Sequence, residues 1–317
     1  MTQEELREQF LKYAYQPGIE EQHEVLGMFA NLFLTIVQIH HKDPANTVAD
    51  KEAKIVLQMM ATKALYLMRT IEGVSFKTNT GFILNNILDP SIIAGQVRNV
   101  FETAGMFNTI YRTVENDEQK ALLHLLWVSA GLKYRQRFVT NIITPDVKKK
   151  QEQEAQHISD IKDEIEKSKI YQELDAKNQE KIQNRIKSKE YLINLNGNNV
   201  NFLNWSEVSK SMGMDEKLFD NMYTYFSLYA HPSNVSVFQF AEMFNTEDPG
   251  YIELTQMNLL YAIFFLSVFL ADYIHLFPKV KETFEKLPLI EQLILNAPNR
   301  LARGANFSIN DSHIALG

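Results

Sequence analysis

The most informative absence from this 317-residue sequence is cysteine, which does not occur at all. Its absence excludes disulfide bonds, cysteine-ligated zinc, iron–sulfur clusters and thiol catalysis, so any chemistry has to come from histidine, carboxylate, arginine and hydroxyl groups. Glycine and proline are also scarce, at 12 and 9 residues. A β-sandwich or barrel needs a turn about every 8–12 residues, so this composition favours helices instead.

Two further absences concern membranes and nucleic acids. The N-terminus is polar and acidic, without the basic start and apolar stretch of a signal peptide. The most apolar run covers only residues 259–271, whereas a membrane span needs about 20 residues, so we expect a buried core helix there. The formal charge of −7 disfavours a general nucleic-acid coat protein, although it is compatible with a local basic groove. These features predict a cytoplasmic protein with no membrane partner.

Helical periodicity runs along most of the sequence. Short clusters of Pro, Gly, Asn and Asp separate helices expected at residues 3–14, 19–41, 47–72, 76–88, 91–113, 116–139, 205–212, 215–231, 233–245, 251–277 and 279–296. Thr47 is placed to cap the third of these helices, whose apolar positions include Ile55, Met59, Leu65 and Met68. With 20 Phe, 13 Tyr and 2 Trp available for a core, we predict an all-α protein built as a multi-helix bundle.

Composition changes sharply after the first 145 residues. Residues 146–190 hold eleven acidic and eleven basic residues and only a thin apolar register. We predict a charged helical hairpin that bends near residues 175–178 and is inserted between two parts of the helical core, residues 1–145 and 191–299, with an irregular tail at 300–317. This hairpin is either a solvated insertion or an arm that binds a protein partner or a second copy, which would make the protein a homo-oligomer.

One segment departs from the helical pattern. Two short runs rich in branched and aromatic residues flank Asn196-Gly197 within residues 191–204. Asn-Gly is favoured in tight turns that need positive φ. We therefore predict one small β-hairpin directly after the charged segment.

The most distinctive candidate site lies on the helix that ends before Pro232. Tyr223, Ser227 and His231 are spaced four residues apart and therefore share one helix face. Pro232 should end the helix at His231, where the helix dipole favours the protonated imidazole. This face could present a phenol, a hydroxyl and an imidazole to a cleft; the alternative is a histidine that only caps the helix.

A second candidate is the pair formed by Arg98 and Glu102, which are one helical turn apart. Val97 and Phe101 mark the neighbouring core face, so the pair is expected at the border of the core. Such a pair could orient His231 if the two helices meet. The alternative is an ordinary ion pair between residues on one helix.

Together these motifs resemble a bacterial all-helical family of unknown function. The shared features are Arg-x-x-x-Glu at Arg98 and Glu102, Trp-Ser followed by Gly at Trp205 and Gly213, and Tyr-x-x-x-Ser-x-Tyr-x-His-Pro-Ser beginning at Tyr223. The resemblance covers roughly residues 55–275. It implies a helical fold in which Arg98, Glu102, Ser227 and His231 converge, and it implies no particular reaction.

That family is in turn reminiscent of HEPN-like helical bundles, many of which are ribonucleases in toxins and phage defence. Their signature is an Arg followed, after four to six intervening residues, by a His. No His follows an Arg at that spacing in this sequence, so Arg98 from another helix would have to complete a site at His231.

Metal and cofactor motifs are weak. Glu-x-x-His occurs at Glu20–His23 and at Glu154–His157, which we attribute to chance in a glutamate-rich chain. The sequence has no P-loop, dinucleotide-binding glycine motif, nucleophile elbow or zincin motif. We expect no metal and no cofactor.

Two functions remain. The first is an intracellular interaction protein, of the kind found in antiviral defence, whose core holds a ligand or partner and whose charged hairpin mediates assembly. The second is a metal-independent, RNase-like hydrolase acting on RNA. There His231 would be the general acid or base, Arg98 would stabilise phosphate charge, and Tyr223 and Ser227 would be accessory donors.

Overall fold

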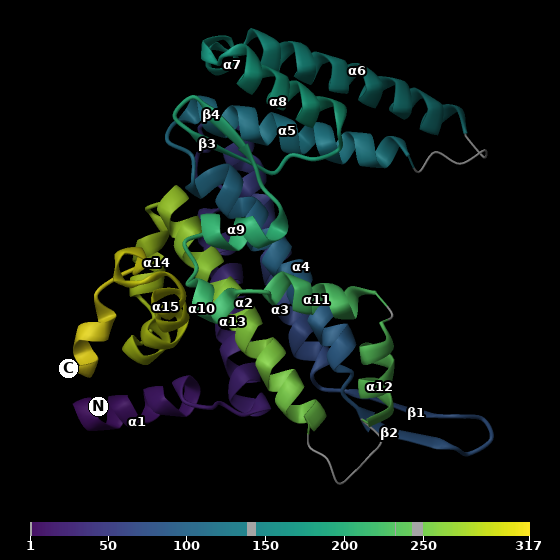
Figure 1. Ribbon diagram of the computed structural model, residues 1–317. Helices are drawn as coiled ribbons and strands as arrows, with labels where there is room; N and C mark the ends of the chain where they lie inside the picture. The colour runs from purple at the N-terminus through teal and green to yellow at the C-terminus, as the bar shows by residue number, and fades with distance from the viewer. Residues whose placement is uncertain (1, 138–143, 232, 243–249) are drawn as a thin grey trace. The chain divides into compact units, whose positions relative to one another are not determined.

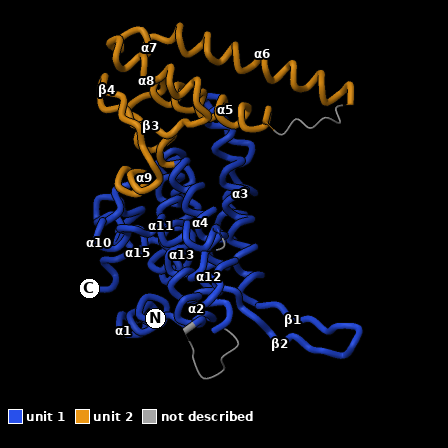
Figure 2. The backbone as a smooth tube through the Cα atoms, turned by 45° about the vertical axis from the view of Figure 1, so that its right-hand side comes forward, with its two compact units in different colours: residues 1–107, 212–317 blue, residues 108–211 orange. Residues whose placement is uncertain are grey.

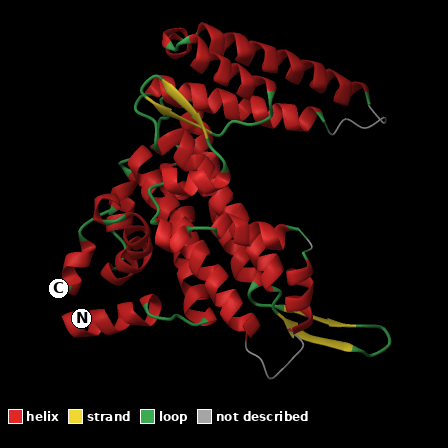
Figure 3. Cartoon of the chain, in the orientation of Figure 1, coloured by secondary structure: helices red, strands yellow, loops and turns green. Residues whose placement is uncertain are grey.

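The computed structural model describes residues 2–137, 144–231, 233–242 and 250–317. The described chain is helical apart from two short antiparallel hairpins, which Figure 3 shows in yellow. This confirms the predicted all-α class. The chain forms two compact units, residues 1–107 with 212–317 (unit 1) and residues 108–211 (unit 2) (Figure 2). The expected insertion at 146–190 is thus part of a larger unit that begins at Asn108 and ends at Ser211.

Unit 1 contains most of the α-helices in the described chain. They are α1 (Gln3–Ala14), α2 (Ile19–His40), α3 (Val48–Thr70), α4 (Pro90–Phe107), α10 (Glu216–Phe219), α11 (Met222–Ala230), α12 (Asn234–Glu242), α13 (Gly250–Leu276), α14 (Val280–Glu285) and α15 (Leu289–Arg303) (Figure 1). Thr47 caps α3 as predicted, because its side chain accepts a hydrogen bond from the Asp50 amide at 3.0 Å. The expected helix at 233–245 is observed as far as Glu242, and its remaining residues lie outside the described ones.

Helix α13 is the centre of unit 1. It contacts α2, α4 and α15, and its Phe265, Phe269 and Tyr273 are buried against aromatic rings of α2 and α4. Its segment Tyr251–Leu276 is long and apolar enough by composition to cross a membrane, but 72% of the most apolar window is buried inside the structure. That burial is typical of the core helix of a soluble protein, as the sequence predicted.

The helix expected at residues 76–88 is wrong. This segment is a hairpin of β1 (Val74–Lys77) and β2 (Ile83–Ile87), with Phe76 opposite Leu84. The turn between the strands places Gly81 at φ +89°, which glycine adopts without steric cost and which a helix does not contain. The Thr78 hydroxyl accepts a hydrogen bond from the Phe82 amide at 3.0 Å and closes the turn.

Helix α3 buries a different face from the one expected. Its buried side chains are small or slender, namely Ala49, Ala53, Val56, Leu57, Met60, Ala61, Ala64 and Leu67. The larger Ile55, Met59 and Leu65, which the sequence marked as its apolar positions, are exposed. The four alanines on this buried face allow α3 to approach α2 and α4 closely.

Unit 2 begins with a π-helical turn, η1 (Asn108–Arg112), followed by α5 (Asp117–Gln136), α6 (Pro145–Lys167), α7 (Lys169–Glu173), α8 (Ala176–Lys187), β3 (Ile193–Asn196), β4 (Asn199–Phe202) and α9 (Trp205–Ser211). The predicted hairpin is present, with Leu195 opposite Val200 and Gly197 at φ +53° in the turn. The charged helices fold back on α5, and Ile161, Ile165, Ile182 and Ile186 are buried. The charged segment is therefore helical and bends before Ala176, close to the expected position.

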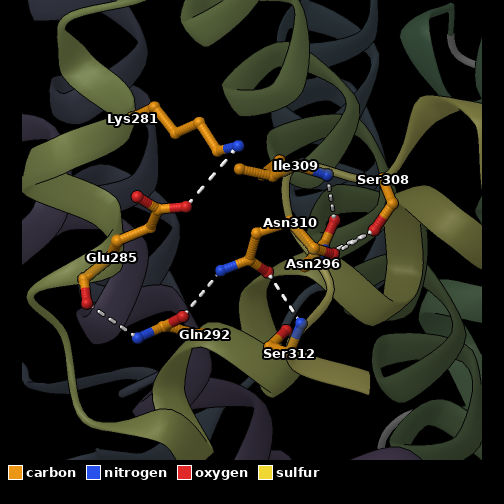
Figure 4. Close-up of polar contacts among 8 residues, drawn as sticks. All are labelled: Lys281, Glu285, Gln292, Asn296, Ser308, Ile309, Asn310 and Ser312. Atoms are coloured by element: carbon orange, nitrogen blue, oxygen red, sulfur yellow. Dashed lines mark hydrogen bonds and ion pairs between the residues drawn. The ribbon is translucent and has the colours of Figure 1, made fainter. Parts of the chain in front are cut away.

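The C-terminal tail is held to α15 by amide side chains. Asn296 donates to Ser308 Oγ at 2.9 Å and accepts from the Ile309 amide at 3.1 Å. Asn310 donates to Gln292 Oε1 at 2.7 Å, and Gln292 donates to the Glu285 carbonyl at 3.0 Å (Figure 4). The tail contains two short 3₁₀ turns, η2 (Ala305–Phe307) and η3 (Ser312–Leu316), so its irregular course is fixed by side-chain bonds.

Candidate functional site

Arg98 and Glu102 lie on α4 at the border of the unit 1 core. Their neighbours Val97 and Phe101 are fully buried, and they hold the helix against α13. Arg98 Nε donates to Glu102 Oε1 at 2.8 Å, and the two side chains are 21% and 29% exposed. The expected ion pair is therefore present and half-buried, in a place that solutes can still reach.

Tyr223 on α11 adds a third side chain to the Arg98–Glu102 pair. Arg98 Nη2 donates to the Tyr223 hydroxyl at 2.6 Å, and the guanidinium carbon lies 4.8 Å from the centroid of the tyrosine ring. A side-chain hydrogen bond also links Tyr223 to Ser227. Burial raises the pKa of the Tyr223 phenol above its usual value, with Arg98 opposing the shift. The phenol consequently stays protonated at neutral pH. Four of the five predicted site residues thus form one connected cluster.

His231 stands apart from this cluster. Helix α11 ends at Ala230, and His231 has the extended conformation φ −121°, ψ 142°. Its side chain is exposed, and within the described part of the chain no hydrogen bond or ion pair joins it to Arg98 or Glu102. Pro232, which was expected to end the helix, lies outside the described residues. The expectation that the Arg98–Glu102 pair orients His231 finds no contact to support it.

The capping alternative for His231 is equally without a contact. No hydrogen bond from its ring to a helix carbonyl occurs in the described ranges. The following helix, α12, is capped by Ser233, whose hydroxyl accepts from the Ser236 amide at 3.1 Å. His231 is therefore an accessible imidazole at the end of the helix that carries Tyr223 and Ser227.

The sequence analysis missed one residue of the cluster, Lys63 on α3. Its ammonium donates to Asn99 Oδ1, one residue along α4 from Arg98. Lys63 is half-buried, and this burial lowers its pKa below the ordinary value, while the nearby carboxylate of Glu102 acts in the opposite direction. No spacing within α3 points to this lysine, because only the packing of α3 against α4 brings it to the site.

The cluster is asymmetric in charge. Two cationic groups, Lys63 and Arg98, lie near one carboxylate, Glu102, which is bonded to Arg98, and the surrounding groups are neutral donors and acceptors (Asn99, Tyr223 and Ser227). An excess positive charge in a half-buried place is costly unless an anion neutralises it. The arrangement can therefore bind an anionic group through charge-assisted hydrogen bonds.

Other candidate positions have structural partners. His40 bonds Asp43 at 2.9 Å and Thr283 at 2.8 Å, and Glu154 pairs with Arg135 at 2.5 Å within unit 2. Among the described residues no group of three or more His, Asp or Glu side chains is arranged to hold a metal ion.

A cavity of about 340 Å³ lies elsewhere in unit 1, between the start of α4, α12 and the start of α13. Its lining residues are Pro90, Gln239, Glu242, Tyr251, Glu253, Leu254 and Met257. None of the residues of the Arg98 cluster lines it, so the cluster is a surface site and the cavity is separate from it.

Comparison with known proteins identified no relative of this chain. No family model, no curated protein and no solved structure matches the chain.

Proposed function

We propose that this protein is an intracellular interaction protein whose Arg98 cluster receives an anionic group of a ligand or partner. The observation that carries the proposal is that two cationic side chains, Lys63 of α3 and Arg98 of α4, lie near a single carboxylate, Glu102, which is bonded to Arg98 and acts on Lys63 only through its charge. The resemblance to helical families of toxins and phage defence is the reason to look for that ligand or partner in a defence system.

The chemistry of the cluster favours phosphate over a simple halide. Arg98 already uses Nε and Nη2, which leaves the other edge of its guanidinium and the Lys63 ammonium as donors. The Ser227 hydroxyl adds a neutral donor on the same side as Tyr223. A tetrahedral anion with several acceptor oxygens can use donors that come from three helices.

Calorimetry and thermal melts with inorganic phosphate, a mononucleotide and a short RNA test this proposal. Lys63→Met should weaken binding about tenfold or more, because it removes a charge-assisted contact. Lys281→Met is the matched control, because Lys281 pairs with Glu285 at 3.5 Å on the surface of unit 1. Equal affinity of wild type and Lys63→Met for every anion, or no binding at all, would contradict the proposal.

A second candidate function, a metal-independent ribonuclease, is favoured by the accessibility of His231. In this mechanism the imidazole would take the proton of a ribose 2′-hydroxyl as its oxygen attacks phosphorus. The P–O5′ bond would break, giving a 2′,3′-cyclic phosphate and a 5′-oxygen that takes a proton from water. Arg98 would stabilise the charge on the phosphate oxygens, with Tyr223 and Ser227 as donors. His231 follows Tyr223 by eight residues, about 12 Å along a helix, so the RNA backbone would have to extend from the cluster to the end of α11.

Cleavage of labelled RNA in the presence of a chelator separates the two functions. If the protein is a ribonuclease, His231→Ala should abolish cleavage and leave the melting temperature unchanged, because His231 is exposed. His41→Ala, at another exposed histidine of unit 1, is the control. Phosphate binding without cleavage supports the interaction protein alone.

A further inference from the structure

The outer face of α3 carries a row of large apolar side chains. Val48, Ile55, Met59, Leu65 and Tyr66 are between 39% and 70% exposed, whereas the opposite face of the same helix is buried against α2 and α4. A contiguous exposed apolar row of this kind marks an interaction surface. We refer to residues 48, 52, 55, 59, 62, 66 and 69 as the α3 seam.

The seam has the spacing of a coiled coil. Its residues, Val48, Glu52, Ile55, Met59, Thr62, Tyr66 and Arg69, follow one another at alternating intervals of four and three. All of them are exposed or half-exposed. A 4–3 repeat on a straight helix places these side chains in one line, about 30 Å long, that fits another helix lying alongside.

We propose that the occupant of this seam is α3 of a second copy, packed antiparallel across a two-fold axis. Centred between Met60 and Ala61, this register places Ile55 against Tyr66 of the second copy and Met59 against its Thr62. It also places Glu52 against Arg69 of the second copy. Arg69 pairs with Glu72 of its own chain at 2.9 Å, an exposed pair that Glu52 of the second copy would join at each end of the seam. Because the axis is two-fold, each of these contacts forms twice.

Charge excludes the parallel arrangement of the same two helices. In a parallel pair Glu52 would face Glu52 and Arg69 would face Arg69, which repel. Between Ile55 and Met68 the only charged residue is Lys63, and its ammonium is bonded to Asn99 of its own chain. The antiparallel seam therefore brings together two acidic chains without opposing like charges, although each chain carries a net charge of −7.

Light scattering on the full chain across a concentration series tests the interface. Wild type should show twice the mass of one chain, and Met59→Glu should show the mass of one chain with an unchanged circular dichroism melt, because Met59 is exposed in the monomer. Leu301→Glu is the matched control, since Leu301 is a 64% exposed apolar residue on α15. A wild type that stays monomeric, or a Met59→Glu variant that stays dimeric, overturns the proposal. Both variants leave residues 146–190 intact, so monomeric Met59→Glu also separates this seam from assembly through the charged segment.

Charge reversal tests the direction of packing. Glu52→Arg and Arg69→Glu alone should each weaken the dimer by roughly tenfold, because two attractive pairs become repulsive. The double variant should restore the wild-type dissociation constant within about threefold, since its charges again meet their opposites. Additive weakening in the double variant contradicts the antiparallel register.

Disulfide trapping tests the register directly, because the chain has no cysteine of its own. After mild oxidation Ile55→Cys/Tyr66→Cys should give a covalent dimer, since each introduced thiol meets the other in the second copy. Each single variant should remain uncrosslinked, because eleven residues, about 16 Å along the helix, separate the two equivalent thiols. Efficient crosslinking of the single variants would show a parallel pair and overturn the proposal.

Discussion

The two compact units are both helical but are stabilised in different ways. In unit 1 the large fully buried side chains are mostly aromatic, and Phe269 of α13 contacts the rings of both Phe33 and Phe107. Among the described residues of unit 2 no phenylalanine is buried, and its buried apolar side chains are mostly aliphatic, with the tyrosines Tyr111 and Tyr171 among them. Aromatic side chains bury the most area per residue, so unit 1 has the larger hydrophobic contribution.

The charged helices of unit 2 each begin at a side-chain cap, as α3 and α12 of unit 1 do. The side chains of Thr144, Ser168 and Asp175 each accept a hydrogen bond from an amide at the start of α6, α7 and α8. Surface ion pairs such as Lys162–Glu166, at 3.6 Å, add little individually. The difference between the units therefore lies in their cores, which are rich in aromatic rings in unit 1 and mostly aliphatic in the described part of unit 2.

The largest expected effect comes from cutting the aromatic core of unit 1. Phe269→Ala should lower the free energy of unfolding of unit 1 by about 3–5 kcal/mol, because it removes ring contacts with Phe33 and Phe107 and leaves a cavity. The change in the free energy of unfolding is measured by urea denaturation, with amide hydrogen exchange reporting on unit 1. Phe238→Ala on α12 is the control, because Phe238 is 64% exposed, and it should change stability by less than about 0.5 kcal/mol.

A smaller effect is expected from the aliphatic layer of unit 2. Ile182→Ala should cost about 2–3 kcal/mol, because a layer between surface helices can partly collapse around the missing side chain. Hydrogen exchange should quicken in α5, α6 and α8 while α13 keeps its protection. Val147→Ala, at an exposed position of α6, is the control. Equal loss of protection in both units would show that they unfold together and would contradict separate stabilisation of the two units.

Local signals explain how much of the fold was predictable. Thr47 before an apolar run marked the start of α3, and Asn196-Gly197 marked the β3–β4 turn. The helix predicted at residues 76–88 is a hairpin instead, because a tight turn closed by Thr78 and Gly81 separates its two apolar runs. On α3 the sequence could not show that alanines, rather than Ile55 and Met59, would face the neighbouring helices, because close packing is a property of the assembled bundle.

The candidate site was predictable only along single helices. Spacing placed Arg98 beside Glu102 and Tyr223 beside Ser227, and the structure joins the two pairs. The same spacing failed to predict the surroundings of His231, because α11 ends one residue before it and the chain becomes extended. Lys63 was missed because its partner Asn99 lies on another helix, a contact that one sequence cannot reveal.

Removing one helix cap should lower the stability of unit 2 less than a core substitution does. Comparing matched caps in the two units shows which unit opens more easily. Asp175→Ala leaves the first amides of α8 without their acceptor and should cost about 1 kcal/mol. Thr47→Ala removes the corresponding cap of α3 in unit 1 and should cost a similar amount. Exchange of α8 amides should nevertheless quicken more than exchange of α3 amides, because the shallower core of unit 2 opens more easily. Faster exchange of the α3 amides than of the α8 amides would contradict the expectation that unit 2 opens more easily than unit 1.

The smallest expected effect concerns single lysines of the two units and depends on pH. Burial lowers the folded-state pKa of Lys63 below the value of 10.5 that applies in the unfolded chain, so between these two values the unfolded state binds more protons. Wild-type stability should therefore gain relative to Lys63→Met as the pH rises through this window, and Lys63→Met should be the more stable protein only below it. Urea denaturation at pH 7 and pH 10.5 measures the difference. Lys162→Met on the surface of unit 2 should show no such trend. A trend of the same size there would mean that the pH dependence does not come from the burial of Lys63.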